Sequence, residues 1–159
     1  MYIRTELRPG DIGYIVYLHG VLYAREYRLD HTFEGYVATG LGAFAQTYDP
    51  AKDFFAVAED EDQIVGSIAI VGLPDNTAQL RWFLVHPKSR GEGLGRRLID
   101  AALTFCRERK FASVLLWTIS ELETASHLYR KVGFQLTEER THELWGAVRT
   151  EQRYDLSLW

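Results

Sequence analysis

Hydrophobic residues recur at helical spacing in the first third of the chain. Residues 2–7 alternate as a short strand does, and residues 11–26 and 31–48 then place apolar side chains every three or four positions. Aspartates stand at the start of both periodic stretches, at Asp11 and Asp30, where a helix needs a side chain to cap its first N–H groups. The pattern predicts one short strand followed by two amphipathic helices.

The middle of the chain changes to strand patterning. Three segments, residues 54–59, 63–71 and 77–85, are rich in apolar strand-forming residues and are separated by short polar turns. Strands joined by such short turns pair with their neighbours in antiparallel fashion. We therefore expect a three-stranded antiparallel meander.

The region after the meander returns to helical spacing and then to a strand. A glycine-rich segment at residues 88–95 leads into an amphipathic stretch that continues to residue 110. Residues 113–118 form a short, nearly continuous apolar run, which suits a buried parallel strand. A strand–helix–strand unit is therefore expected here.

The last third of the chain predicts one more helix and two strands. Ser120 and Glu123 have the spacing of a capping box, and Gly133 suits the residue after a helix because glycine adopts a left-handed conformation without steric cost. Residues 134–139 and 154–158 are the final predicted strands, and the stretch between them has no clear pattern.

The order of these elements predicts a mixed α/β fold of the α+β kind. One strand–helix–strand unit after an antiparallel meander gives a mixed, mostly antiparallel central sheet flanked by helices. The 159 residues suit a single domain over residues 1–159, and a hydrophobic content of 47% is enough for a core without disulfides.

Composition and charge exclude several classes of protein. The apolar content and a net charge of −4 are incompatible with intrinsic disorder, and the acidic balance argues against a nucleic-acid partner. No apolar run approaches the length of about 20 residues that spans a membrane, and residues 1–10 have no signal-peptide core. The lone cysteine, Cys106, cannot form an internal disulfide, and we expect its thiol to be buried and inert. We also expect a cytoplasmic protein with no membrane partner.

The glycine-rich loop before the third predicted helix is the strongest chemical signal. Glycines let backbone N–H groups converge, and the following helix adds its unpaired first-turn N–H groups, so the loop suits a phosphate. The loop matches neither the Walker A pattern nor the dinucleotide fingerprint. The pattern that it does carry is R-x-x-G-x-G. The predicted anion-binding residues are Arg90, Gly91, Glu92, Gly93, Leu94, Gly95 and Arg96.

Two stretches of sequence resemble the GNAT superfamily of N-acetyltransferases. VHPKSRGEGLGRRLID, residues 85–100, resembles the acyl-CoA-binding motif, and WTISELETASHLYRKVGF, residues 117–134, carries the Tyr-x-x-x-Gly-Phe of a family helix. The segments RPGDIG and LRWFLVHP are most like those of the acetyltransferase domains fused to MarR-type regulators. We expect a free-standing version of such a domain here. The resemblance implies acetyl-CoA as co-substrate, splayed parallel strands at the cofactor cleft, and direct attack by a primary amine in a ternary complex.

The resemblance also implies roles for individual residues. Tyr129 takes the place of the general acid, and a backbone N–H of Leu84 or Val85 would hold the acetyl carbonyl. Ser126 would line the same cleft. Related domains carry an asparagine where this chain has Ile119, and Ser120 would compensate for the lost hydrogen bond.

The acceptor site and the general base are less well defined. In the family the first two helices wall the acceptor site, and their side chains here include His19, Tyr23, Glu26 and Tyr27. Glu26 could act as a base through water. No metal is expected, because the five histidines show no paired metal-ligand spacing.

Two alternatives remain open at this point. A non-catalytic acyl-CoA-binding sensor or regulatory module would carry the same loop. A homodimer is also possible, with the terminal predicted strand at its interface.

Overall fold

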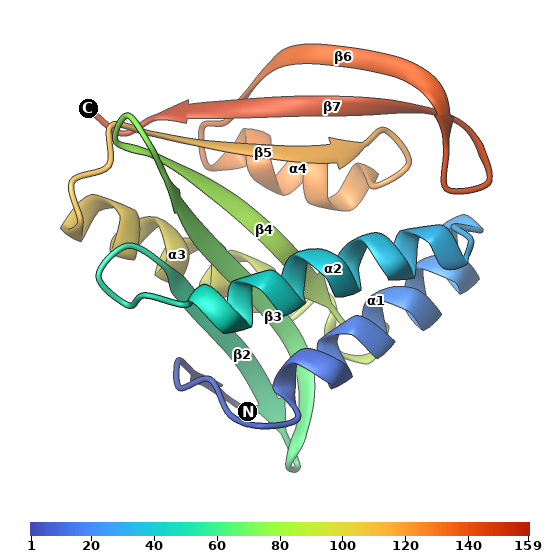
Figure 1. Ribbon diagram of the computed structural model, residues 1–159, viewed down its shortest axis with the longest axis horizontal. Coiled ribbons are helices and arrows are strands. Elements are labelled where there is room, and N and C mark those ends of the chain that lie inside the picture. Colours follow the sequence, from blue (N-terminus) through green and yellow to red (C-terminus); the bar gives the residue numbers. More distant parts are fainter.

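The computed structural model describes residues 1–159 as a seven-stranded sheet with four α-helices (Figure 1). The strands are β1 (Tyr2–Arg4), β2 (Phe54–Asp60), β3 (Gln63–Leu73), β4 (Thr77–Val85), β5 (Ser113–Ile119), β6 (Gln135–Leu144) and β7 (Ala147–Ser157). The helices are α1 (Asp11–Tyr27), α2 (His31–Thr47), α3 (Leu94–Glu108) and α4 (Glu123–Lys131), and η1 (Pro87–Ser89) is one turn of 3-10 helix.

The sheet has the order β1-β2-β3-β4-β5-β7-β6. All neighbouring strands are antiparallel except β4 and β5, which run parallel. The predicted mixed, mostly antiparallel sheet and its meander are confirmed. No helix is both long and apolar enough to cross a membrane.

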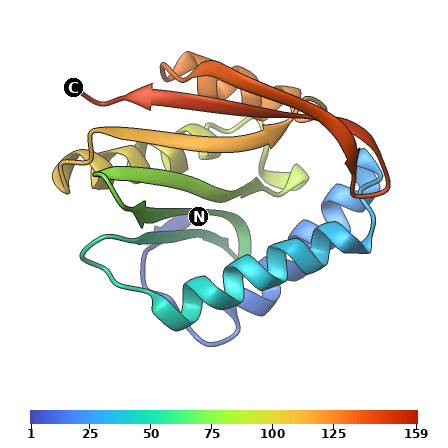
Figure 2. The ribbon, with the colours of Figure 1, turned by 45° about the horizontal axis from the view of Figure 1, so that its top comes forward.

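Two hydrophobic cores fill the two faces of the sheet. Helices α3 and α4 pack on one face with residues such as Leu98 and Tyr129, and helices α1 and α2 pack on the other with residues such as Ile15 and Leu41. The separation of the two helix pairs is visible when the molecule is turned (Figure 2). Cys106 lies fully buried in the α3–α4 core, as expected, and burial raises the pKa of its thiol to about 12.

A bulge in β4 opens the sheet between its two parallel strands. The pairing of β4 with β5 covers only Thr77–Gln79, and the register of β4 against β3 shifts beyond it. Trp82 adopts a φ of 50°, and its carbonyl accepts a hydrogen bond from the Ser67 hydroxyl at 2.7 Å. Leu80 faces the α3–α4 core, whereas Trp82 and Leu84 face the α1–α2 core. The bulge therefore rotates β4 and separates its far end from β5.

Helix starts agree with the sequence in one case and differ in two. Asp30 caps α2, its carboxylate accepting the Thr32 N–H at 3.0 Å, as predicted. The capping role predicted for Asp11 is wrong, because Gly10 precedes α1 and the Asp11 carboxylate instead pairs with the buried Arg4 guanidinium at 2.9 Å. The capping box predicted at Ser120 is also wrong, because α4 begins at Glu123 without a side-chain cap.

The C-terminal strands are longer than the sequence predicts. Residues 140–153 complete a hairpin of β6 and β7, closed by Trp145 (φ 54°) and Gly146 (φ 99°) in the left-handed region that two-residue hairpin turns require. Strand β6 forms the exposed edge of the sheet and carries polar residues on both sides, so it shows no alternation. Tyr154 is fully buried, and β7 lies between β5 and β6 with no free edge for the interface expected there.

Candidate active site

Two adjacent cavities lie where β4 and β5 separate. The first, which we call the loop cavity, measures about 260 Å³ and lies between the glycine-rich loop, the end of β4 and helix α4. The second, the split cavity, measures about 120 Å³ and passes between β4 and β5. Both are lined by Tyr23, Phe83, Leu122 and Ala125. The two cavities therefore adjoin at these four side chains.

The glycines of the glycine-rich loop line the loop cavity. Gly91 and Gly93 have φ values of 79° and 80°, and Gly93 precedes α3 without a side-chain cap. A Cβ on Gly95 would come within 3.1 Å of Leu128 and 3.2 Å of Phe83. The loop thus needs glycine for its turns and for close packing on α4, and it leaves the first turn of α3 open to an anion.

Arg90 crosses from the loop to helix α1. Its guanidinium makes two hydrogen bonds to the Glu26 carboxylate, at 2.6 and 2.8 Å, and one to the Val85 carbonyl at 3.2 Å. The bonds to the Glu26 carboxylate raise the pKa of Arg90. Glu26 lines neither cavity, so this carboxylate serves the loop and not the acceptor side.

Some of the other predicted cofactor-binding residues line the loop cavity, and others are exposed to solvent. Arg96 and Leu94 line the loop cavity, and Arg96 also pairs with Asp100 at 3.0 Å. Glu92 and Ser120 are exposed and line neither cavity. The structure therefore brings most of the predicted residues to the loop cavity, but not Glu92 or Ser120.

The free edge of β4 faces the gap. The Val85 and Leu84 side chains line the loop cavity. The His86 N–H donates to Val65 on β3 at 2.8 Å. Since N–H groups alternate in direction along a strand, the N–H of Val85 faces away from β3 and toward the gap, whereas that of Leu84 faces β3.

Tyr129 is the buried aromatic at the junction of α4 with the split cavity. Its ring packs near Phe83, Phe134 and Tyr154 at centroid distances of 5.8 to 6.1 Å, and it is 5% exposed. Burial raises the pKa of its phenol, so the hydroxyl keeps its proton at neutral pH.

Two buried hydroxyls near Tyr129 have no partner within the protein. These are Thr118 Oγ1, on the wall of the split cavity, and Ser126 Oγ, one turn before Tyr129 on α4. A buried polar atom without a hydrogen bond is costly, and such atoms are commonly explained by a bound group. Ser126 was expected to line the cleft but lines neither cavity, whereas Thr118, which the sequence did not indicate, lines the split cavity.

His19 and Tyr23 project from α1 into the split cavity. His19 is 3% exposed, its Nδ1 lies 2.8 Å from the Ile15 carbonyl, and burial lowers its pKa to about 4. The imidazole is therefore neutral at pH 7, with Nδ1–H donating to the carbonyl. Burial raises the pKa of the Tyr23 phenol, and the Tyr23 hydroxyl donates to the Phe83 carbonyl at 3.4 Å. Tyr27 lines the loop cavity only.

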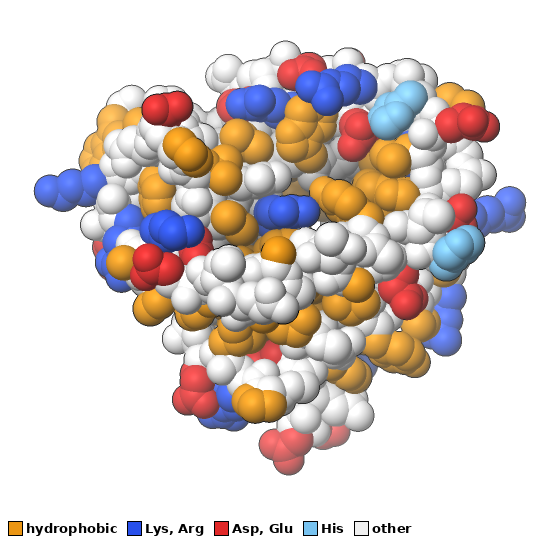
Figure 3. All heavy atoms as spheres, viewed as in Figure 1, with side chains coloured by type: hydrophobic (Ala, Val, Ile, Leu, Met, Phe, Trp, Pro, Cys, Tyr) orange, Lys and Arg blue, Asp and Glu red, His pale blue; other side chains and the backbone are white.

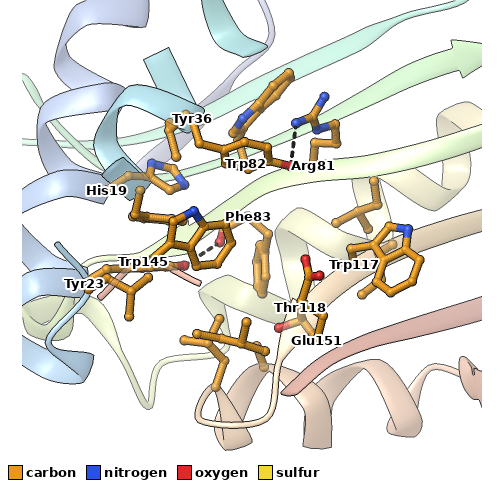
Figure 4. Close-up of a pocket in the computed structure, with 18 of the residues that line it drawn as sticks. His19, Tyr23, Tyr36, Arg81, Trp82, Phe83, Trp117, Thr118, Trp145 and Glu151 are labelled. Carbon is orange, nitrogen blue, oxygen red and sulfur yellow. Dashed lines mark hydrogen bonds between the residues drawn. The ribbon is translucent and has the colours of Figure 1, made fainter. Parts of the chain in front are cut away.

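The C-terminal hairpin contributes residues that the sequence did not indicate. Trp145 and Glu151 line the split cavity together with Trp117 and Arg81 (Figure 4). Trp117 is half-buried on the cavity wall. On this face of the molecule, apolar side chains gather in the hollow between α2 and the C-terminal strands (Figure 3). The sequence prediction began the last strand at residue 154, so it left Glu151 outside the strand. In the structure Glu151 lies on β7, opposite Ile119 of β5.

The family assignment follows from a match that covers most of the fold. The model of the acetyltransferase (GNAT) family matches residues 16–134, from α1 through the end of α4. The chain belongs to the GNAT acetyltransferase family. Its glycine-rich loop and parallel β4–β5 pair lie within the matched region of this GNAT chain.

Relatives of this GNAT chain carry N-acetyltransferase names. An uncharacterized N-acetyltransferase of Schizosaccharomyces pombe is 30% identical over 123 residues, which are 76% of this chain and 74% of that protein. N-acetyltransferase 8B of Homo sapiens is 30% identical over 99 residues, 59% of this chain. The chain spans less than half of that human protein, 44% of its length.

Solved structures share the whole fold. An acetyltransferase from Streptococcus agalactiae is 26% identical, with a TM-score of 0.81 over 99% of this chain and 98% of that one. A Salmonella typhimurium protein, whose structure includes its cofactor acetyl-CoA, is 19% identical, with a TM-score of 0.74 over 100% of this chain and 94% of that one. At 19% identity, the likeness to the Salmonella typhimurium protein shows a shared fold.

Proposed function

We propose that this protein transfers an acetyl group from acetyl-CoA to a primary amine while both are bound. The observation that carries the proposal is that the two cavities share lining residues where the sheet splits. Tyr23 and Phe83 line both of them, so an acyl donor on the loop side and an acceptor on the α1–α2 side would meet in the gap. The donor would supply an activated acetyl thioester.

The loop cavity suits the phosphates and the extended arm of coenzyme A. The turns at Gly91 and Gly93 and the open first turn of α3 would hold the pyrophosphate, and Arg90 and Arg96, each paired with a carboxylate, line the same cavity. Ser126, also expected to bind, is buried and lines neither cavity, so it gives the loop site no support. Glu92 and Ser120, also expected to bind, gain no support from their exposed positions.

The free edge of β4 and Tyr129 would act on the acetyl group. The outward N–H of Val85 would hold the carbonyl oxygen, and the Tyr129 hydroxyl would give its proton to the departing thiolate. Burial keeps the Tyr129 phenol protonated at neutral pH, which is the form that a general acid needs, but the raised pKa does not make it a stronger acid.

The acceptor would enter from the side of α1 and α2. His19 and Tyr23 line this part of the split cavity, and Tyr27 lies farther along on the loop side. The MarR-linked resemblance, a homodimer and a cytoplasmic location stay predictions.

A thiol-release assay tests the transfer. Purified protein is mixed with acetyl-CoA and a panel of primary amines, and free coenzyme A is measured. We expect at least one amine to accelerate thiol release and to appear as its N-acetyl product. Binding of acetyl-CoA without acceleration by any amine would contradict the enzyme and favour a sensor module.

A further inference from the structure

Glu151 is the sole carboxylate on the wall of the split cavity. Fifteen of the 20 residues that line the cavity are hydrophobic. The other four polar or charged residues are His19, Gln79, Arg81 and Thr118. An amine entering this cavity would therefore find one negative group.

The arginines around Glu151 are already paired with other carboxylates. Glu151 lies on β7, and the neighbouring cations on the hairpin come from both of its strands. Their pairs are Arg140 with Glu138 at 2.5 Å, Arg149 with Glu121 at 2.5 Å and Arg153 with Asp155 at 2.9 Å. Glu151 thus has no arginine partner, and its own side-chain contact is with His142.

The Glu151 carboxylate has a route to solvent through His142. Its Oε2 lies 2.7 Å from His142 Nε2, and the His142 side chain is 46% exposed. Glu151 is paired in register with Ile119, so it lies on the α1–α2 face of the sheet. A proton taken from the cavity could leave along this pair of side chains.

The other charged group, Arg81, lies on a different wall. It belongs to β4, which β5 separates from β7. Its guanidinium lies 4.4 Å from the Trp82 ring centre and donates to the Tyr36 hydroxyl at 3.1 Å. Figure 4 shows Arg81 and Glu151 at opposite ends of the cavity. A cationic ligand is therefore drawn to the Glu151 end.

Two tryptophans with unusual backbone conformations form the aromatic walls. Trp82 and Trp145 have φ values of 50° and 54°, a region that bulky L residues rarely adopt. Hydrogen bonds to the Trp145 carbonyl, from the Asp30 N–H at 3.1 Å and from Arg149 at 3.3 Å, hold its turn in place. Such backbone conformations are energetically unfavourable, so they persist only where the surrounding structure fixes them. They are often found at ligand sites.

We propose that the split cavity binds a primary amine with an apolar, aromatic body and that Glu151 receives its ammonium group. The inference rests on the proposed function and names its acceptor. The ammonium would lose one proton to the Glu151 carboxylate, which passes it through His142 to water, and a neutral amine remains. A neutral nitrogen is the form that attacks a carbonyl carbon.

Binding of small probes tests this inference without turnover. 2-Phenylethylamine and the uncharged 2-phenylethanol are titrated at pH 7 against the fluorescence of the tryptophans, three of which line the cavity. We expect the amine to bind at least tenfold more tightly than the alcohol. In Glu151→Gln this preference should disappear, since the amide keeps the size but not the charge. Equal binding of the two probes by the parent would overturn the proposal.

A matched variant on the same hairpin provides the control. Glu139 is exposed on β6 and lines neither cavity, so Glu139→Gln should keep the preference for the amine. A preference that survives in Glu151→Gln, or disappears equally in Glu139→Gln, would overturn the assignment.

Turnover separates this inference from the proposed function. Glu151→Gln should lower the rate of acetyl transfer to 2-phenylethylamine by more than tenfold with acetyl-CoA binding unchanged. Glu151-dependent amine binding without any transfer by the parent would uphold the amine site and contradict the acetyltransferase. Parent-like transfer by Glu151→Gln would overturn the role of Glu151.

Discussion

Burial sets the protonation state of individual residues in this site. The Tyr129 phenol keeps its proton because its pKa is raised, and the His19 imidazole stays neutral because its pKa is lowered to about 4. Both effects come from desolvation of the charged form. Both side chains are thus uncharged at neutral pH, the phenol with its proton and the imidazole without its second one.

Replacing Tyr129 tests the proposed acid. Tyr129→Phe removes the hydroxyl and keeps the buried ring, so kcat should fall by about 100-fold, within the range that general acids contribute. The affinity for acetyl-CoA, measured by calorimetry, should stay within about twofold of the parent, because the loop is untouched. Tyr154→Phe removes another phenolic hydroxyl from this core, outside both cavities, and should keep kcat. Parent-like kcat in Tyr129→Phe would contradict the assignment.

His19 makes stability depend on pH. Its pKa is about 4 in the folded protein against an ordinary 6.5, so the unfolded chain binds more protons between these values. Stability is therefore lost as pH falls from 6.5 toward 4, by about 3 kcal/mol at most from this residue. Urea unfolding at several pH values should show this slope, and His19→Asn should reduce it. An equal slope in both proteins would show that His19 is not responsible.

The loop and helix α3 act together at the scale of the element. The turn at Gly93 has a φ of 80°, and a Cβ there would meet no atom within 4 Å. Backbone strain and charge can therefore be varied at this position without a clash. Asparagine and aspartate both tolerate the left-handed conformation better than other side chains.

A pair of substitutions separates strain from charge at this turn. Gly93→Asp places a carboxylate where a pyrophosphate would bind and should weaken acetyl-CoA binding by at least tenfold. Gly93→Asn has the same size and a similar conformational tolerance, and it should weaken binding much less. Equal affinity in the two folded variants would remove the loop from the phosphate site.

Local signals made some elements predictable from sequence and left others hidden. The apolar run of β5 predicted a buried parallel strand, and the glycines before α3 predicted an anion-binding loop. The bulge at Trp82 was not predictable, because its left-handed residue is a tryptophan and not a glycine. The register of Glu151 was hidden for a similar reason, since Trp145-Gly146 is not a common hairpin turn sequence.

At the scale of the whole molecule, the split between β4 and β5 joins the two helix layers. Pairing of these strands ends at Gln79 and Leu115, and beyond it the cavity wall includes Tyr129 from one face and His19 from the other. A closed sheet would keep these two layers apart. The fold therefore creates a passage in which a donor and an acceptor can meet.

Calorimetric titration of the purified protein with acetyl-CoA tests the central claim most directly. The account predicts one-to-one binding with micromolar affinity, because one loop cavity is present at the edge of the split. No heat of binding from folded protein, up to millimolar acetyl-CoA, would contradict the cofactor site and with it the proposed acetyl transfer.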